Sequence, residues 1–450
     1  MPTSADYALS CEVFLVPWDG QYLLYAPVKG LVAAVNPAAA CLVRDLEQGE
    51  PFDLTEAEHA LADQLADIGV VNGEPDPRLF VFEGQPFQPI HTTLFLTNAC
   101  NLRCLYCYAE GGELETSVIP DAAARAAIDF VADNALRREV AAFSVGFHGA
   151  GEPTVAWRTY TRLVRYAQAR ADALGLRVTP STATNGVLTE RQACWMARHT
   201  TSANLSVDGP ADVQDLQRPR VDGSGSFEHV ARTMRVFDAE GFSYAIRATI
   251  TELNVHRMAE MVEFFADEFH PQQLQFDPLI VSGRCRRVGW RPPEDDLFVE
   301  EFLRAFRVGQ ERGILVGFSS VGFSGYRTYF CAAAADGFTV THEGYVTACF
   351  EAYSPTRPFG DRFVYGRYDE ATGTFDLDLE KLAQLQKRHV YNLPYCERCF
   401  CKYMCAGDCP IHALYQHSDA EHGLRCQAVQ EVARHRLALI LRDQEVRAHG

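Results

Sequence analysis

The fold class is decided by one stretch of sequence, which reads Thr97-Asn98-Ala99-Cys100-Asn101-Leu102-Arg103-Cys104-Leu105-Tyr106-Cys107-Tyr108. Its three cysteines have C-x3-C-x2-C spacing, and an aromatic residue precedes the last of them. Three thiolates on one loop can wrap one face of an iron–sulfur cube and leave the fourth iron open to an exogenous ligand. A structural zinc site would need a fourth protein ligand. The spacing therefore favours a [4Fe–4S] cluster held by Cys100, Cys104 and Cys107 over zinc.

A strand is predicted at residues 91–98, so the cysteines of this stretch lie directly after it. Strand and helix patterns then alternate along the chain. Further strands are predicted at residues 141–148, 177–184, 203–207, 242–249 and 274–280, with helices at 121–137, 157–174, 227–240 and 258–269. This repetition predicts an α/β fold whose parallel sheet curls into a partial (β/α)6 TIM barrel. Ligands of such sheets bind beyond the carboxyl ends of the strands, so the residues that follow each strand are candidates for a site.

Three segments at later strand ends complete a resemblance to the radical S-adenosylmethionine (SAM) superfamily. They are Gly149-Ala150-Gly151-Glu152-Pro153, Thr184-Asn185-Gly186 and Ser206-Val207-Asp208-Gly209-Pro210. The first segment departs from the family's Gly-Gly-Glu-Pro by the inserted Ala150. The resemblance covers about residues 91–321 and implies that SAM is bound by Tyr106, Gly149, Gly151, Glu152, Thr184, Asn185, Ser206, Asp208 and Arg218.

The resemblance also implies a reaction type. SAM would chelate the open iron, and one electron from the cluster would break its C5′–S bond, giving methionine and a 5′-deoxyadenosyl radical. That radical would take a hydrogen atom from an unactivated carbon of the substrate. A flavodoxin or ferredoxin is the expected electron donor. The cofactors carry this chemistry, and the protein orients them.

A second set of cysteines lies near the C-terminus. It has the order Cys-x12-Gly-x4-Cys from residue 331, then C-x2-C-x5-C-x3-C from residue 396, and a last cysteine at 426. This order is similar to the SPASM domain, which carries auxiliary [4Fe–4S] clusters. Two cysteine pairs alone could also form a zinc ribbon. The resemblance implies three [4Fe–4S] clusters in all, with one auxiliary cluster on Cys331, Cys349 and Cys409 and the other on Cys396, Cys399, Cys405 and Cys426.

The first auxiliary cluster has only three assignable ligands, and the sequence leaves its fourth position open. Either one iron is free, or Cys285 or Cys401 completes the site. The same two cysteines are candidate hydrogen-atom donors if the reaction is an epimerisation. Anaerobic sulfatase maturases carry an aspartate base just after the position of Cys349, where this chain has Phe350 and then Glu351. Glu351 is therefore the candidate base, and the departure counts against sulfatase maturation.

The first 88 residues predict a small winged-helix-like module. Strands are expected at residues 11–17 and 21–28 around Asp19-Gly20, a hairpin signal, and helices are expected after Asn36 and Thr55. The module holds 3 basic and 14 acidic residues, which is −11 of the chain's net charge of −18. This charge indicates either a solvated acidic face or a site for basic peptide. The order of elements resembles the PqqD-like domain that holds the leader of a precursor peptide, often by adding a strand to a sheet edge.

These patterns together predict three domains, at residues 1–88, 89–321 and 322–450. The expected protein is a radical SAM/SPASM oxidoreductase that forms an intramolecular thioether, C–C or C–O crosslink in a ribosomally made precursor peptide. The alternatives are a peptide epimerase, a modifier of a folded protein such as a sulfatase maturase, and a non-catalytic iron–sulfur or zinc peptide-binding protein. A net charge of −18 argues against nucleic acid as a partner. The absence of a long apolar run or signal pattern predicts a cytoplasmic protein that does not enter a membrane.

Overall fold

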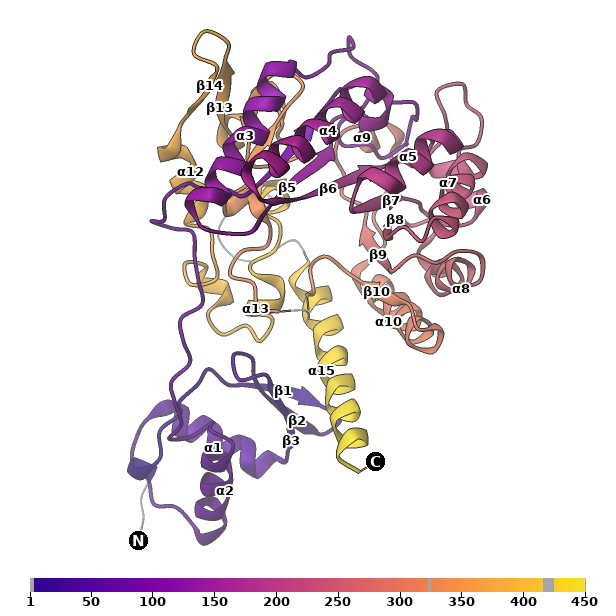
Figure 1. The fold of residues 1–450 in the computed structure, drawn as a ribbon. Helices are drawn as coiled ribbons and strands as arrows, with labels where there is room; N and C mark the ends of the chain where they lie inside the picture. Colours follow the sequence, from indigo (N-terminus) through magenta and orange to yellow (C-terminus); the bar gives the residue numbers. More distant parts are fainter. Residues whose placement is uncertain (1–3, 323–324, 416–424, 450) are drawn as a thin grey trace.

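The computed structural model describes residues 4–322, 325–415 and 425–449 (Figure 1). At the N-terminus, β1 (Phe14–Trp18), β2 (Gln21–Ala26) and β3 (Leu31–Val35) form an antiparallel sheet in that order. Asp19 and Gly20 join the first two strands with φ angles of 46° and 72°, as a two-residue type I′ hairpin requires. The first strand begins three residues later than the sequence predicts, because the Ser10 and Glu12 amides donate to Val70 and Asp76 instead.

Two capped helices complete this N-terminal module. In α1 (Pro37–Gln48), the Asn36 side chain accepts from the Ala39 amide at 2.8 Å, and Gly49 ends the helix with a φ of 71°. In α2 (Glu56–Asp67), Thr55 and Glu58 form a reciprocal capping box. Both helices pack against the sheet through a separate core of Leu24, Leu42, Val43, Leu46, Leu54, Ala62, Leu65, Val70 and Val71.

The main body is an eleven-strand sheet wrapped by helices (Figure 1). Seven strands run parallel in chain order: β4 (His91–Phe95), β5 (Ala142–His148), β6 (Arg177–Thr184), β7 (Ser202–Ser206), β8 (Tyr244–Ile250), β9 (Gln273–Pro278) and β10 (Leu315–Gly317). Between them lie α3 (Asp121–Arg137), α4 (Trp157–Leu174), α5 (Glu190–His199), α6 (Ala211–Gln217), α7 (Phe227–Ala239), α8 (Met258–Glu268), α9 (Cys285–Val288) and α10 (Asp295–Arg312). The predicted α/β fold with a parallel sheet is confirmed, and its curvature is consistent with a partial barrel.

The other edge of this sheet comes from the C-terminal part of the chain. The strand β11 (Thr339–Val340) pairs parallel with β4, and β12 (Tyr345–Thr347), β13 (Val364–Asp369) and β14 (Thr374–Leu377) follow as an antiparallel meander. The sheet therefore runs across the predicted boundary at residue 322. The division of the chain into three domains stays a prediction.

The C-terminal helix connects this region to the N-terminal module. The cysteine-rich segment contains α11 (Gly360–Phe363), α12 (Leu379–Gln386), α13 (Lys402–Cys405) and α14 (Pro410–Tyr415), and α15 (Cys426–His449) then runs down to the module (Figure 1). There the Trp18 ring meets the His435 ring edge-on, with the centroids 5.0 Å apart. Among the described residues, no helix combines the length and apolar character needed to span a membrane.

Candidate functional site

The cysteine loop after β4 lies against the glycine-rich segment after β5. The Gly151 amide donates to the carbonyl of Thr97 at 3.0 Å, and the Glu152 amide donates to the carbonyl of Ala99 at 2.8 Å. A Cβ atom at Gly151 would overlap with the Ala99 carbonyl, so only glycine allows this approach. The inserted Ala150 is buried and packs in one apolar cluster with Phe95 and Tyr353.

The thiols of the loop lie close enough that neighbouring cysteines affect the pKa of Cys100 and of Cys104. Burial and the neighbouring Cys104 thiol raise the pKa of Cys100. Burial raises the pKa of Cys104 to about 11, although the cations Arg218 and Arg284 lower it. Three thiols on one loop with two guanidinium groups nearby match the donor set of an anionic cluster with one open iron. These residues therefore fit a [4Fe–4S] cluster of the kind that the sequence predicts.

The segment after β9 contacts this loop and stabilises it. These contacts were not predicted from the sequence. The Arg284 Nη1 donates to the carbonyl of Cys104 at 2.6 Å, and its Nε donates to the Glu113 carboxylate at 2.6 Å. A Cβ atom at Gly283 would overlap with the carbonyl of Cys107. The only sequence signal was position, since Ser282-Gly283-Arg284 follows a strand end.

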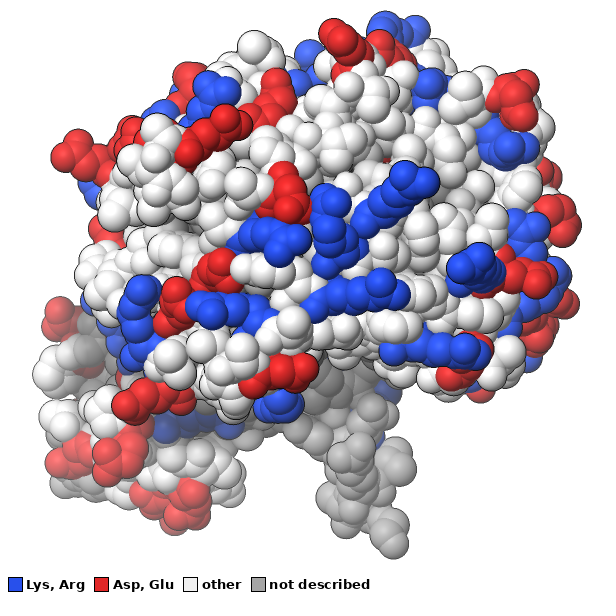
Figure 2. Space-filling view, turned by 45° about the horizontal axis from the view of Figure 1, so that its top comes forward, with Lys and Arg blue, Asp and Glu red and all other residues white. Residues whose placement is uncertain are grey.

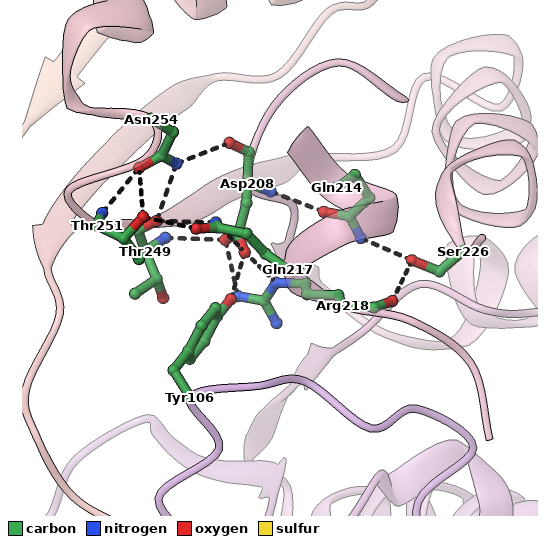
Figure 3. A network of polar contacts seen from close by, with 9 residues as sticks. All are labelled: Tyr106, Asp208, Gln214, Gln217, Arg218, Ser226, Thr249, Thr251 and Asn254. Carbon is green, nitrogen blue, oxygen red and sulfur yellow. Dashed lines mark hydrogen bonds and ion pairs between the residues drawn. The ribbon is translucent and has the colours of Figure 1, made fainter. Parts of the chain in front are cut away.

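A buried carboxylate organises the strand ends opposite the loop (Figure 3). Asp208 is fully buried and accepts from the Tyr106 hydroxyl. It also accepts from the Arg218 guanidinium at 2.9 and 3.0 Å, and from the Thr249 amide and Gln217 Nε2, each at 2.9 Å. Burial opposes the charge on Arg218, but Asp208 outweighs it and holds the arginine pKa well above its usual value. Tyr106, Asp208 and Arg218 are thus one rigid unit.

The same unit presents a cation toward the cysteine loop. The guanidinium carbon of Arg218 lies 5.1 Å from the centre of the Tyr106 ring. The Arg218 Nε and Nη2 groups donate to Asp208. No acceptor for Arg218 Nη1 is found among the described residues. One pair of N–H groups thus stays available for a carboxylate, which is the role that the family resemblance implies for Arg218.

Glu152 joins two further predicted segments. Its Oε1 accepts from the Thr184 hydroxyl at 2.8 Å, and its Oε2 accepts from the Asn185 amide at 2.8 Å. The Asn185 side chain in turn donates to Asn101 in the cysteine loop at 2.7 Å. Burial raises the pKa of Glu152 although four hydrogen bonds favour its charged form. The Glu152 carboxylate therefore links the ends of β5 and β6 through these hydrogen bonds.

The barrel interior contains a cavity lined by both polar and apolar residues. A cavity of about 420 Å³ is lined by side chains that include His148, Ser181, Asn204 and Gln273. Ser206 pairs in register with Arg247 on β8, whose Nε donates to Asp277 at 2.8 Å. The sequence did not indicate Arg247 or Asp277 as site residues, because a single charged residue within a strand pattern does not by itself predict a functional site.

The three cysteines of the first auxiliary set, Cys331, Cys349 and Cys409, lie near one another. Burial and the nearby thiols of Cys331 and Cys349 raise the pKa of Cys409 well above its usual value. Glu351 lies beside Cys349, and its Oε1 contacts His412 Nε2 at 3.0 Å. The other carboxylate oxygen of Glu351 is buried and has no hydrogen-bond partner among the described residues.

The second auxiliary set surrounds a small cavity of about 80 Å³, lined by Cys396, Cys399, Cys401, Cys405 and Cys426. Cys401 therefore lies with this set and not with Cys331, Cys349 and Cys409. A hydrogen bond from the Cys401 thiol is the main cause that lowers the pKa of Cys399 to about 6. Cys285 is buried on α9, where its thiol donates to the carbonyl of Trp290 at 3.3 Å.

Comparisons with known proteins agree with this geometry. Residues 94–265 match the family model described as the radical SAM superfamily. The serine-type anaerobic sulfatase-maturating enzyme of Klebsiella pneumoniae is 24% identical over 332 residues, which is 70% of this chain and 80% of the relative. The mycofactocin maturase MftC of Mycolicibacterium smegmatis is 31% identical over 224 residues, which is 47% of this chain and 50% of the relative.

Two solved structures share the fold. The anaerobic sulfatase-maturating enzyme anSMEcpe with bound AdoMet superposes with a TM-score of 0.62 at 18% identity, covering 79% of this chain and 96% of that one. Streptococcus suis SuiB bound to S-adenosylmethionine gives 0.52 at 12% identity, covering 93% of this chain and all of that one. The chain thus carries a radical SAM domain. The chain is an enzyme whose homologues include the anaerobic sulfatase-maturating enzymes and the mycofactocin maturases, and its radical SAM match covers residues 94–265.

Proposed function

We propose that this enzyme modifies a ribosomally made precursor peptide by forming an intramolecular crosslink. The observation that carries the proposal is the joint presence of the three-cysteine loop and two further cysteine sets, one of which offers only three thiols. When bound, SAM and its cluster supply a 5′-deoxyadenosyl radical that abstracts a hydrogen atom from the substrate. The structure of anSMEcpe with the bound Cp18Cys peptide supports a peptide as substrate.

The chain's own residues would perform three tasks. Arg218, fixed by Asp208, would orient the carboxylate of SAM through its remaining N–H groups, and Gly149 and Gly151 would offer backbone to its amino group. Glu152, Thr184, Asn185 and Ser206 would line the bound cofactor from the neighbouring strand ends. The cavity of the barrel interior would admit a substrate side chain.

The two auxiliary sets are assigned different roles in this proposal. Cys331, Cys349 and Cys409 would hold a cluster with one open iron, which would bind a thiolate or other heteroatom of the substrate and accept the electron released when the crosslink bond forms. Tyr108 is near both cysteine sets, and burial together with the thiols of Cys107 and Cys349 raises its pKa. The set of Cys396, Cys399, Cys405 and Cys426 would exchange electrons with a flavodoxin or ferredoxin.

The number of clusters is tested by metal analysis. Ten motif cysteines can hold three cubes when each incomplete set leaves one iron without a protein thiolate. Anaerobically reconstituted protein should therefore contain about twelve iron atoms per chain. Bound zinc with only about four irons would contradict the auxiliary clusters and favour the zinc-ribbon alternative.

The type of reaction is tested by mass spectrometry in deuterated water, with a precursor peptide identified from a neighbouring short reading frame as substrate. Crosslink formation removes two hydrogen atoms from the peptide and incorporates no deuterium at an α-carbon. Epimerisation, with Cys285 or Cys401 returning a hydrogen atom, would keep the formula and introduce one deuterium. The second outcome would show that the crosslink proposal is wrong.

Sulfatase maturation is a second candidate, because the sulfatase-maturating enzymes match over most of their length. Glu351 would then be the base, and its buried, unpartnered oxygen is available to accept a proton. Incubation with a peptide that carries a sulfatase-type serine or cysteine distinguishes this candidate, since its product is an aldehyde that hydrazine reagents label.

A further inference from the structure

The inner face of strands β5, β7, β8 and β9 carries small or polar side chains. Alternate residues of a strand point to opposite faces, and on β8 Ile246 and Ala248 are buried in the main core. Ala245, Arg247 and Thr249 therefore lie on the inner face. The same alternation places these residues there: Ser144, Gly146 and His148 of β5, Ser202, Asn204 and Ser206 of β7, and Gln273, Gln275 and Asp277 of β9. Barrels are usually filled by bulky branched side chains, so this inner face leaves room for a ligand in the cavity of about 420 Å³.

Arg247 is held on this face by a single carboxylate. Its Nε donates to Asp277 Oδ2 at 2.8 Å, and the other Asp277 oxygen accepts from the Ser319 hydroxyl at 2.7 Å. No acceptor for Arg247 Nη1 or Nη2 is found in the described part of the chain, and 56% of the side chain is exposed. These two groups form the planar fork that binds a carboxylate through two parallel hydrogen bonds. The fork is thus available to a ligand.

Arginines elsewhere in the main body are placed differently. Figure 2 shows Lys and Arg side chains in a band across its outer surface, with Asp and Glu side chains among and beside them. Arg312 is a surface arginine whose Nη1 and Nη2 donate to the two oxygens of Asp267 at 2.9 and 3.4 Å. The fork of Arg312 is therefore occupied, whereas that of Arg247 lies inside the barrel without a partner among the residues that the structure describes.

His148 supplies a second donor, from a strand on the other side of the inner face. Its Nδ1 accepts from the Gly149 amide at 2.7 Å. Burial and the charge of Arg247 lower the pKa of His148 to about 4, so the imidazole is neutral near pH 7. A neutral imidazole that accepts at Nδ1 carries its proton on Nε2. No acceptor for this proton is found within the described ranges, and His148 lines the cavity.

Two phenylalanines fix the plane of the His148 ring. The Phe350 and Phe95 ring centroids lie 4.8 and 5.8 Å from that of His148. Phe350 also lines the cavity, at the position directly after Cys349 where sulfatase maturases carry their aspartate. Because the ring cannot rotate without displacing its aromatic neighbours, the direction of the Nε2–H group is set before a ligand binds.

Both residues lie at the border between the cavity and the proposed SAM site. His148 is the last residue of β5, and the glycine-rich segment follows it. Arg247 is paired in register with Ser206 on β7. Asp277 raises the pKa of Arg247, and the charge of the nearby Arg218 opposes this rise. A carboxylate bound by Arg247 and His148 would therefore hold its own carbon atoms close to the site where the radical forms.

We propose that Arg247 and His148 bind a carboxylate of the substrate inside the barrel, and that the enzyme thereby selects an acidic residue or a chain-terminal residue for hydrogen abstraction. The inference rests on the proposed function in one respect, that the substrate is a peptide. It adds the chemistry of the residue to be modified. A neutral amide of the same shape would leave the guanidinium fork without its anionic partner, and unpaired groups of this kind discriminate strongly between analogues.

The test compares three blocked alanine pentapeptides. The first has a central aspartate, the second has a free C-terminal carboxylate, and the third has a central asparagine and no carboxylate. Binding to the full-length reconstituted protein is measured by saturation-transfer NMR with SAM present and no reductant, so that no turnover occurs. At least one acidic peptide should bind about tenfold more tightly than the asparagine peptide, and the tighter one identifies the source of the carboxylate. Equal affinities for all three would overturn the proposal.

Substitutions assign this selectivity to the two residues. Arg247→Met should weaken binding of the acidic peptide about tenfold and leave the asparagine peptide unchanged, and Arg247→Lys, which keeps the charge without the fork, should lose less. His148→Phe should weaken binding about threefold, whereas His148→Gln keeps an N–H donor and should bind like the wild type. Arg312→Met removes an arginine whose fork is already occupied, so this matched control should alter neither affinity. Undiminished selectivity in Arg247→Met would contradict the assignment.

A separate measurement distinguishes a substrate site from a cofactor site. The SAM affinity of Arg247→Met, measured by equilibrium dialysis, should be close to that of the wild type, because Arg218 is the residue assigned to the SAM carboxylate. A large loss of SAM affinity with unchanged peptide selectivity would place Arg247 in the cofactor site and overturn the proposal. None of these readouts requires turnover, so failure to form a crosslink would count against the proposed function and not against the carboxylate site.

Discussion

Replacing Cys100, Cys104 and Cys107 together by alanine is expected to abolish 5′-deoxyadenosine formation. The three thiols are the only ligands that the loop after β4 offers, and the residues that would orient SAM face this loop. A cluster without them cannot present an open iron to SAM. The measurement is the amount of 5′-deoxyadenosine released by reduced protein, with iron analysis and EPR on the same sample. The proposed auxiliary clusters should remain visible, because the cysteines assigned to them lie in the C-terminal region.

A matched control replaces three cysteines that lie outside every set, Cys11, Cys41 and Cys194. This second triple variant should keep both its iron content and its SAM cleavage. Retained cleavage in the first variant would show that another set of thiols holds the reactive cluster.

The substitution Asp208→Ala is expected to lower the free energy of unfolding by about 3–5 kcal/mol, because it leaves the buried Arg218 cation without its counter-ion. It also removes the acceptor for Tyr106, Gln217 and the Thr249 amide. The double variant Asp208→Ala/Arg218→Met should lose less stability than Asp208→Ala alone, since no unpaired charge remains. Urea unfolding of the wild type and both variants measures the difference.

An exposed ion pair provides the comparison for this prediction. Asp267 and Arg312 lie 2.9 Å apart at the surface, with 55% and 42% of their side chains exposed. Asp267→Ala should cost less than about 1 kcal/mol, as is usual for such pairs. Equal losses for Asp208→Ala and Asp267→Ala would mean that the Asp208 network does not stabilise the strand ends.

Features with a strong local signal were predictable from the sequence. The six strands from β4 to β9 match expected segments, because each has an apolar pattern and is followed by a helix or a glycine-rich turn. The N-cap at Asn36 and the capping box of Thr55 and Glu58 were also readable from spacing alone. Motif order placed Glu152, Thr184, Asn185 and Asp208 at strand ends, and the family resemblance indicated Arg218. The structure brings all five to one side of the cysteine loop.

Features that depend on distant partners were not predictable. Strands β10 and β11 have three and two residues, too few for any periodic pattern, and only their neighbours define them. Arg284 braces a loop about 180 residues away in sequence, and no local pattern marks such a contact. Cys401 stands two residues from Cys399, and only the folded loop shows which set it accompanies.

The pairing of β11 with β4 limits how this enzyme can be divided or recombined. The strand β4 is central to the sheet only because β11 and the meander behind it supply the remaining hydrogen bonds. A fragment that ends near residue 322 would expose the unpaired edge of β4, and uncovered edges of this kind promote aggregation. A chimera that exchanges substrate specificity between relatives should therefore transfer residues 91–377 as one piece. Such a fusion would keep the edge closed and remain a monodisperse protein on size-exclusion chromatography, whereas one joined at residue 322 would not.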